Sequence, residues 1–430
     1  MRVLMFGWEF PPHISGGLGT ASYGLTKGMA ALDDLEVIFV IPKAWGDEDQ
    51  SMIRLIGANK VPVAFKKIYY HGARKPVDQI EISSKVVPYT DPDEFWKIVS
   101  SEETGQKVVI QTNNEGMVDF SGKYGPNLLE EIYKYSVVAS IIAEENEFDI
   151  IHAHDWLTYP AGIAARQVSG KPLVIHVHAT DFDRSGGSVN PDVYRIEKSG
   201  MDAADKIITV SNLTRDIVIN KYNIHPDKVE TVYNAVEPLS MSHDIFINKG
   251  FDEKVVTFLG RITLQKGPEY FIEAAYKVLK AMHNVRFVMA GSGDMMERMM
   301  RRAASLKITD RFHFTGFLKG RDVFTMLAMS DVYIMPSVSE PFGISPLEAM
   351  QSNVPVIISK QSGVAEILTH AVKTDFWDID AMADAIYGIL NYPALASEFI
   401  KNGKEEVIRM KWDNSARHVK DIYERVIWKK

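Results

Sequence analysis

Short apolar runs alternate with longer amphipathic stretches along most of the chain. In the first half, such runs occur at residues 3–6, 37–41, 150–154, 173–178 and 207–210. Their length and continuous hydrophobicity are typical of strands that are buried on both faces of a parallel sheet. Helical patterns separate most of them. This half therefore predicts a doubly wound α/β domain.

A second series of the same kind follows, at residues 255–259, 285–290, 312–315, 332–335 and 354–358. Helical segments again lie between the runs, which predicts a second Rossmann-like domain. Ligands of open α/β sheets bind at the carboxyl ends of the strands, so two such domains facing each other would enclose a cleft.

The stretch 234–252 lacks clear periodicity and predicts the linker between the two domains. We therefore expect a first domain over residues 1–240 and a second over 250–410. Residues of about 66–125 fit the scheme poorly, because 66–70 and 80–88 look like extra strands inserted into the first domain.

The last residues, 411–430, predict a tail that closes back on the first domain. Over 412–428 the pattern is amphipathic, and the apolar side consists of Ala416, Val419, Ile422, Tyr423 and Val426. Such a stripe is typical of a helix that packs on a core.

Composition excludes several classes of function. The formal net charge is −8, so no overall positive field would hold nucleic acid or an anionic membrane. The chain has no cysteine, which excludes disulfides, thiolate catalysis and cysteine-based metal sites. The first apolar run is too short for a signal peptide or a membrane span. We expect a cytoplasmic protein without a transmembrane segment.

A glycine-rich loop follows the first predicted strand and leads into a helical pattern. Gly16, Gly17 and Gly19 allow a ligand close to the backbone, and free amides at a helix start favour an anion. A plain tight loop remains an equal interpretation. Neither the Walker pattern nor the dinucleotide Gly-x-Gly-x-x-Gly is present here, which disfavours ATP or NAD binding of those types.

A second loop, residues 260–267, carries Arg261 and Lys266 directly after a predicted strand. Arg supplies a fork of donors and Lys a compact charge, so the pair can neutralise a departing diphosphate. Taken alone, a loop of this kind would favour the interpretation that the two side chains are solvated surface cations.

Two carboxylates lie eight residues apart just after the strand predicted at 332–335. Between Glu340 and Glu348, the residues Phe342, Gly343 and Ile344 can present backbone amides to a hexose or a phosphate. One carboxylate can accept hydrogen bonds from sugar hydroxyls and the other from ribose. For Glu348, an interaction with the dipole at a helix start is the alternative.

With this spacing and the upstream Arg and Lys, the sequence resembles the retaining GT-B glycosyltransferases of glycosyl transferases group 1, whose signature is two Glu separated by seven residues. The resemblance includes the glycine loop, residues 290–294 and 314–317 and the Trp412 tail, and leaves out the insertion. The motifs look most like those of bacterial glycogen and starch synthase-like enzymes.

The resemblance implies a role for each motif residue. Arg261 and Lys266 would hold the donor diphosphate, while Glu340 would bind the hexose and Glu348 the ribose. Phe317 would line the base pocket. The further donor contacts that it implies are Gly16, Gly17, Gly291, Phe342, Gly343 and Ile344.

Four histidines end two predicted strands of the first half: His152, His154, His176 and His178. At a period of two residues each pair shares a face, so one interpretation is a metal cluster. The other places His152 and His176 inside the sheet and His154 and His178 at the cleft.

The resemblance favours the second interpretation. It implies His154, Asp155 and Trp156 on the acceptor side and a catalytic His178 near the donor sugar, with no metal.

Three tryptophans, Trp8, Trp45 and Trp156, could stack on sugar rings or simply pack in the core.

The expected reaction is transfer of a hexose, glucose above all, from UDP-glucose or ADP-glucose to an α-glucan, without a further cofactor. The alternatives of the same fold are a sucrose-phosphate-synthase-like or mannosyl-transferring enzyme, a nucleotide-sugar 2-epimerase, and a phosphorylase with pyridoxal phosphate. A nucleotide-sugar-binding scaffold without activity is the alternative outside enzymes.

The glycine loop departs from the family. Typical bacterial glycogen synthases have Lys-x-Gly-Gly-Leu here, whereas this chain has Ile14 in place of the lysine. With one positive charge fewer beside the donor phosphates, we expect UDP-glucose to serve at least as well as ADP-glucose.

Overall fold

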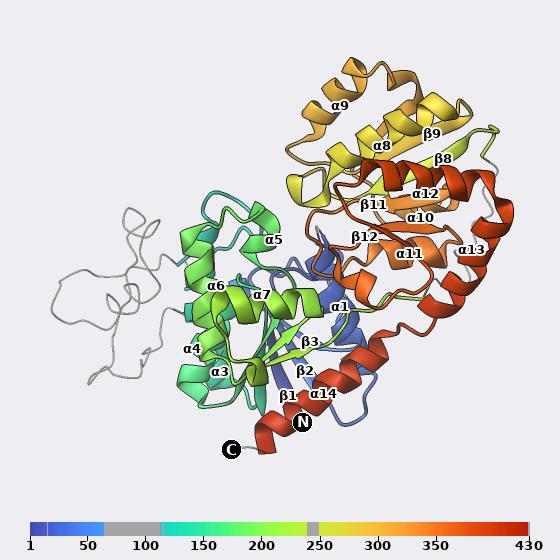
Figure 1. Cartoon of the computed structure of the whole chain (residues 1–430). Coiled ribbons are helices and arrows are strands. Elements are labelled where there is room, and N and C mark those ends of the chain that lie inside the picture. The colour runs from blue at the N-terminus through green and yellow to red at the C-terminus, as the bar shows by residue number, and fades with distance from the viewer. Residues whose placement is uncertain (15, 64–111, 114–115, 239–248, 429–430) are drawn as a thin grey trace.

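The chain forms two α/β domains joined by a C-terminal helix (Figure 1). The structure is a computed structural model, and it describes residues 1–14, 16–63, 112–113, 116–238 and 249–428. The strands predicted at 66–70 and 80–88, most of the insertion, and Ser15 of the glycine loop lie outside the described residues.

The first domain is built on a seven-stranded sheet with the order β3-β2-β1-β4-β5-β6-β7. All neighbouring strands are parallel. The strands are β1 (Arg2–Phe6), β2 (Glu36–Ile41), β3 (Arg54–Gly57), β4 (Ile150–His154), β5 (Leu173–Val177), β6 (Lys206–Thr209) and β7 (Val229–Thr231).

The second domain has a six-stranded parallel sheet with the order β10-β9-β8-β11-β12-β13. The strands are β8 (Lys254–Leu259), β9 (Val285–Ala290), β10 (Phe312–Gly316), β11 (Val332–Met335), β12 (Val356–Ser359) and β13 (Val372–Thr374). Every apolar run of the two predicted series coincides with one of these strands, and the predicted α/β class is confirmed.

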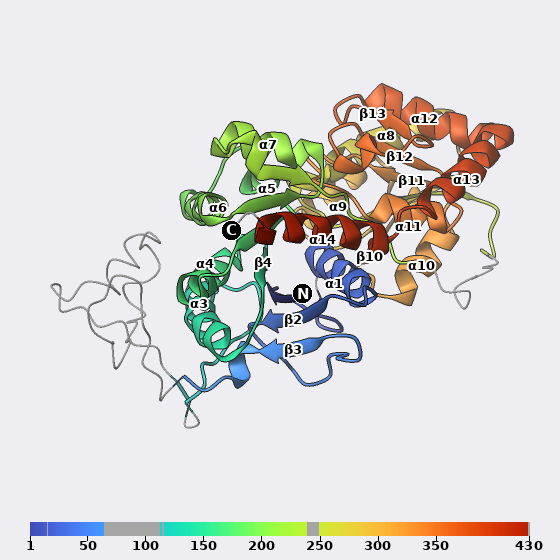
Figure 2. The same ribbon diagram turned by 90° about the horizontal axis from the view of Figure 1, so that it is seen from below.

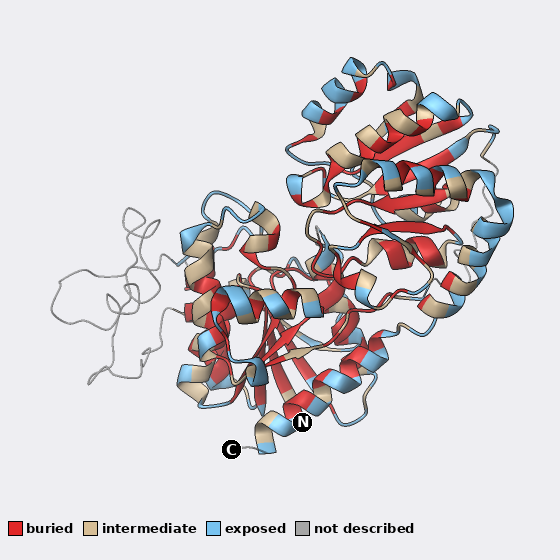
Figure 3. Ribbon diagram, in the orientation of Figure 1, coloured by how far each residue is buried: buried red, intermediate tan, exposed pale blue. Residues whose placement is uncertain are grey.

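Three short strands, β3, β7 and β13, were not predicted. All three lie at sheet edges, and each has exposed or partly buried positions, whereas the central strands are buried over most of their length. Central strands appear as continuous apolar runs because both of their faces are covered, as Figure 3 shows. These three short edge strands lack this signal.

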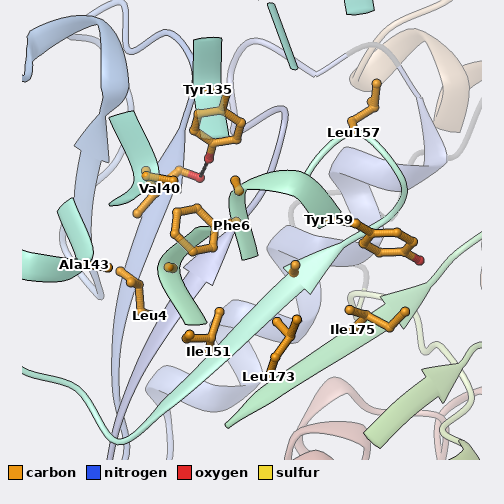
Figure 4. Packing of buried hydrophobic residues seen from close by; sticks show 14 of the residues in the cluster. Leu4, Phe6, Val40, Tyr135, Ala143, Ile151, Leu157, Tyr159, Leu173 and Ile175 are labelled. Carbon is orange, nitrogen blue, oxygen red and sulfur yellow. Dashed lines mark hydrogen bonds between the residues drawn. The ribbon is translucent and has the colours of Figure 1, made fainter. Parts of the chain in front are cut away.

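Helices cover both faces of the first sheet. On one face α3 (Leu128–Glu145), α4 (Tyr159–Ser169) and α7 (Asn212–Tyr222) contribute to a core that contains Phe6 and Ile151. Figure 4 shows this packing, with the Tyr135 hydroxyl bonded to the carbonyl of Val40 (2.8 Å). The other face is covered by α1 (Gly17–Ala30) and α14 (Trp412–Trp428).

The second sheet is sandwiched in the same way. The helices on one face are α8 (Pro268–Ala281), α9 (Met296–Ser305) and α12 (Ile379–Asn391). On the other face lie α10 (Arg321–Ala328), α11 (Ser345–Gln351) and α13 (Pro393–Val407). Two short 3₁₀ segments, η5 (Leu264–Lys266) and η7 (Gly363–Glu366), lie in the loops that face the first domain.

The C-terminal helix α14 returns to the first domain and lies along α1 (Figure 2). Two glycines of α1 make room for it: a Cβ added at Gly24 would lie 2.3 Å from the Trp412 ring, and one at Gly28 would lie 2.7 Å from the Trp412 carbonyl oxygen. Ala416, Val419, Ile422 and Tyr423 are buried, so the predicted apolar side of this helix is confirmed.

Behind the strand ends of the first sheet, the four histidines form a buried stack between β4 and β5. Ring centroids of neighbouring imidazoles lie 4.3–5.4 Å apart. His152 Nδ1 bonds to the Tyr423 hydroxyl of α14, whereas both nitrogens of His176 lack a hydrogen-bond partner. Burial, with the neighbouring imidazoles adding to it, lowers the pKa of His176 well below its usual range.

This stack makes folding sensitive to acid. In the unfolded chain a histidine has a pKa of about 6.5, so below this pH the unfolded chain binds protons that the buried imidazoles of the folded chain do not bind. The free energy of unfolding therefore falls as the pH falls. Each such histidine contributes a slope of at most about 1.4 kcal/mol per pH unit.

We therefore predict that His176→Leu lowers by about one the number of protons that the chain takes up when it unfolds in acid. Because neither ring nitrogen has a partner, the substitution leaves no other group unsatisfied. Urea unfolding at pH 7.5 and 5.5 measures the effect, with the exposed His283→Leu as a control. Equal acid sensitivity of wild type and His176→Leu would contradict the account.

Candidate active site

The loops after β8 and β9 pack so closely that only glycine fits at position 291. Gly260 and Gly291 have φ angles of +159° and +144°, and a Cβ at Gly291 would lie 1.8 Å from the Gly260 carbonyl oxygen. Gly291, predicted as a donor contact, thus has a structural requirement of its own, because it sets the course of the loop that carries Arg261.

The sequence-predicted Lys266 and Glu340 meet in the structure, although 74 residues separate them. The ammonium of Lys266 forms an ion pair with Glu340 Oε2, and Ser337 Oγ donates to the same oxygen (3.3 Å). Glu340 is buried. A buried carboxylate needs such a partner, and the pair fixes one charge of each sign at the carboxyl ends of β8 and β11.

Close packing at Gly267 brings the loop after β8 against the loop after β11. Gly267 has a φ of +63°, and a Cβ added there would lie 2.1 Å from the Pro336 carbonyl oxygen. Arg261 lies on the same loop as Lys266, with an exposed guanidinium that donates to Gln265 Oε1 (3.3 Å). Both predicted cations therefore lie in the loop at the carboxyl end of β8, where an anion could contact them.

The segment from Glu340 to Gly343 is held from behind by η7. Gly363 N donates to the Glu340 carbonyl oxygen (2.9 Å) and Val364 N to that of Phe342 (2.8 Å). Phe342 is buried, Gly343 has a φ of +101°, and the chain then enters α11 one residue after Ile344, at Ser345. The predicted motif is thus a rigid turn.

Glu348 lies in the first turn of α11. Burial raises the pKa of this carboxyl to about 7. A helix start would lower the pKa, so burial outweighs the dipole at this position. A ligand with hydroxyl donors would favour the ionised form of Glu348.

The remaining donor-side predictions lie at exposed positions. A Cβ at Gly16 or Gly17 would meet no described atom within 4 Å, and α1 starts here without a side-chain cap or an acidic residue in its first turn. Phe317 follows Gly316, whose carbonyl oxygen accepts from Gly291 N (2.8 Å), and its ring is 52% exposed.

On the first domain, His178 follows β5 and is nearly buried. Its backbone N–H donates to Asp155 Oδ1 (2.9 Å), and its Nε2 lies 2.9 Å from His154 Nδ1. Burial lowers the pKa of His178 to about 4, so the ring is neutral at neutral pH. Trp156, predicted on the acceptor side, is partly buried against the core.

Asp155 organises this edge of the first domain. Its φ is +61°, and its Oδ2 accepts from Arg184 (2.9 Å) while Oδ1 holds the backbone of His178 and Ala179. Left-handed backbone at a residue other than glycine is uncommon, and such strain is concentrated at functional sites. Asp155 therefore fixes the position of the His178 loop.

Sequence reasoning missed the buried network behind Asp155. Arg184 also pairs with Glu197 (3.3 Å), which accepts from the Tyr222 hydroxyl. Burial raises the pKa of Glu197 to about 7. Nothing in the periodicity of these segments marks Glu197 as buried, because the polar groups that neutralise it come from other elements.

The two domains meet beside these residues. Ser339, next to Glu340, donates to Asp183 Oδ1 (2.6 Å), and Asp183 also caps α5 (Asp181–Ser185) through Thr180. Asp183 is five residues from His178. The contact thus brings the His178 and Glu340 loops to one junction.

Two groups of described residues have the composition of a metal site. His152, His154 and His176 place one nitrogen each within 4.8 Å of one another, as do the ligand atoms of His13, Asp47 and Glu48. In the second group, both Glu48 oxygens already accept backbone N–H groups, those of Trp45 (2.6 Å) and Gly46 (2.9 Å).

In the histidine group, one nitrogen of His152 contacts Tyr423, and one nitrogen of His154 contacts His178. Activity without a metal stays a prediction.

Comparison with known proteins gives the same picture as the geometry. The model of Glycosyl transferases group 1 matches residues 243–406, and that of Glycosyltransferase Family 4 matches residues 108–238. An uncharacterised glycosyltransferase of Methanocaldococcus jannaschii is 28% identical over 443 residues, with 98% of each chain covered. A glycogen synthase of Mycobacterium tuberculosis is 21% identical, with 98% of this chain and 94% of that protein covered.

Solved structures share the fold. Sucrose-phosphate synthase of Thermosynechococcus elongatus superposes with a TM-score of 0.70 at 17% identity, with both chains fully covered. HepE of Anabaena in complex with UDP-glucose has a TM-score of 0.68 at 15% identity, with 99% of this chain and 100% of that chain covered. Among the described residues, no helix has the length and apolar character needed to span a membrane.

The chain has two Rossmann-like domains and a tail helix that returns to the first of them, and one glycosyltransferase family model matches within each domain. The chain therefore belongs to the GT-B glycosyltransferases.

Proposed function

We propose that this glycosyltransferase transfers glucose from a nucleoside diphosphate glucose to an α-glucan, with retention of the anomeric configuration. The observation that carries the proposal is the Lys266–Glu340 pair, which sets a cation for a diphosphate beside a carboxylate for a hexose. The relative named glycogen synthase and the neighbour bound to UDP-glucose support the choice of acceptor and donor.

In this proposal the donor binds mainly to the second domain. Arg261 and Lys266 neutralise the diphosphate as the bond to the sugar breaks, which stabilises the charge that develops on the leaving group. Lys266 and Ser337 both bind Oε2 of Glu340, so Oε1 is the oxygen that would accept from hexose hydroxyls. Glu348 would accept from the ribose hydroxyls.

The first domain would contribute His178 and bind the acceptor. The imidazole is neutral at neutral pH because of its low pKa, so it adds no positive charge next to the developing oxocarbenium-like sugar. The backbone carbonyl of His178 would steady that charge. Asp155 would keep this carbonyl in place through the hydrogen bonds to His178 N and Ala179 N.

The proposed chemical step is attack on the same face as the leaving group. The bond from the anomeric carbon to the diphosphate oxygen breaks, the acceptor hydroxyl oxygen bonds to that carbon, and its proton passes to the departing phosphate. Neither metal nor a further cofactor is needed in this scheme, because Arg261 and Lys266 carry the compensating charge.

Of the three tryptophans considered from the sequence, Trp45 is the most exposed. Trp8 is buried and Trp156 is partly buried, whereas Trp45 is 47% exposed in the loop after β2. His13 lies 5.0 Å from its ring and Lys43 Nζ 4.2 Å. We propose that this face of the first domain contacts the glucan acceptor.

The first prediction for the proposed site concerns Glu340→Gln. Because the proposed contacts of this carboxylate are to the hexose, most turnover should be lost while the nucleoside diphosphate still binds. Steady-state kinetics and UDP titration calorimetry measure the two effects separately. An unchanged turnover number would remove Glu340 from the proposed site.

For the diphosphate clamp, we predict that Arg261→Ala and Lys266→Ala each cost about 2–4 kcal/mol in transfer, as expected when a charge-stabilising donor is lost. Arg261→Ala is the cleaner variant, because it leaves no buried carboxylate unpaired. Lys360→Ala, which removes an exposed cation paired with Asp375, is the control. Kinetics near wild type for both variants would exclude the clamp.

A donor and acceptor screen tests the proposed function as a whole. UDP-glucose should serve at least as well as ADP-glucose with a malto-oligosaccharide acceptor, and activity should survive a chelator. A tenfold preference for ADP-glucose, or about 1.4 kcal/mol, would contradict the donor prediction. Transfer to fructose 6-phosphate alone, epimerisation without acceptor, or bound pyridoxal phosphate would each replace the proposal with another reaction.

A further inference from the structure

A single carboxylate of the second domain caps a helix of the first. Glu366, the last residue of η7, accepts hydrogen bonds from Asn212 N (2.9 Å) and Leu213 N (2.7 Å). These are the first two residues of α7, where backbone N–H groups have no partner within the helix. The negative charge also complements the positive end of the helix dipole.

Neighbouring groups hold this carboxylate in place. The Tyr233 hydroxyl donates to Glu366 Oε2 (2.9 Å) and accepts from Asn212 Nδ2 (2.8 Å). The chain is tightly packed just before Glu366, since a Cβ added at Gly363 would lie 2.4 Å from Ser211 Cβ and 2.2 Å from the Pro341 carbonyl oxygen. Thus η7 lies directly against the start of α7.

The same short segment supports the proposed hexose site. Gly363 and Val364 donate to the carbonyl oxygens of Glu340 and Phe342, and Glu340 N donates to the Gln361 carbonyl oxygen (2.9 Å). Three backbone hydrogen bonds therefore join the residues before Glu366 to the turn that carries Glu340. A shift of η7 relative to α7 would move Glu340 relative to the first domain.

We propose that Glu366 is a positioning residue for glycosyl transfer: by capping α7 across the domain junction it sets the Glu340 turn against the His178 edge. The inference rests on the proposed role of Glu340. Donor groups come mainly from the second domain, so losing the cap should leave nucleotide binding intact and slow the step that needs both domains.

The chain offers a matched control within one domain. Glu406 of α13 accepts hydrogen bonds from Thr369 N (2.7 Å) and His370 N (3.0 Å), two consecutive amides of the same second domain. Glu366→Ala and Glu406→Ala each remove a carboxylate from two neighbouring backbone N–H groups. They differ in whether that carboxylate joins the two domains.

The experiment compares kcat, donor KM and UDP affinity of these two variants with wild type, together with their urea unfolding. We expect Glu366→Ala to lower kcat at least tenfold with UDP affinity within twofold of wild type. Glu406→Ala should keep kcat within twofold at a similar loss of stability. Equal kcat values for the two variants would overturn the proposal and leave Glu366 as a helix cap alone.

Two milder substitutions keep the test decisive if Glu366→Ala fails to fold. Glu366→Gln keeps one oxygen acceptor and should show an intermediate kcat, and Tyr233→Phe removes the hydroxyl that donates to the carboxylate. Wild-type kcat in both overturns the proposal. Full turnover in Glu340→Gln would instead refute the role of Glu340, so the two failures are distinguishable.

Discussion

The candidate site depends on one ion pair, that of the partly buried Lys266 with the buried Glu340. A carboxylate that is withdrawn from water requires a cation at hydrogen-bond distance, and this requirement brings the loop after β8 against the loop after β11. A residue that tolerates positive φ and close backbone approach makes the contact possible, as at Gly267 against the Pro336 carbonyl oxygen. The pair then presents both charges at the strand ends, where open α/β sheets bind their ligands.

The second constraint is that neither domain contains the whole site. The His178 edge belongs to the first domain and the Glu340 turn to the second, so their relative placement has to be set by contacts that cross between them. Contacts of this kind among the described residues include Ser339 with Asp183, Glu366 with the start of α7, and α14 lying along α1. Glu366 binds backbone N–H groups and α14 packs through buried side chains, and such contacts fix position more firmly than a pair of exposed side chains.

Sequence patterns were sufficient wherever a feature depends on local spacing. Central strands are continuous apolar runs, and the tail helix was predicted with the bounds it has in the structure, Trp412–Trp428. The Lys266 and Glu340 motifs could be placed in strand-end loops because each follows a run directly. Other features depend on partners that are distant in sequence, and hydrophobic periodicity does not indicate them. Examples are edge strand β13, the Arg184–Glu197 pair and the room that Gly24 leaves for Trp412.

The central claim is that a diphosphate held by Arg261 and Lys266 leaves from the same face that the acceptor attacks. The configuration of the product tests it most directly: proton NMR of the reaction with UDP-glucose and a malto-oligosaccharide reports the anomeric proton of the first product formed. The account predicts an α-linked glucose from the α-linked donor. A β-linked product would contradict it, because inversion requires attack from the opposite face.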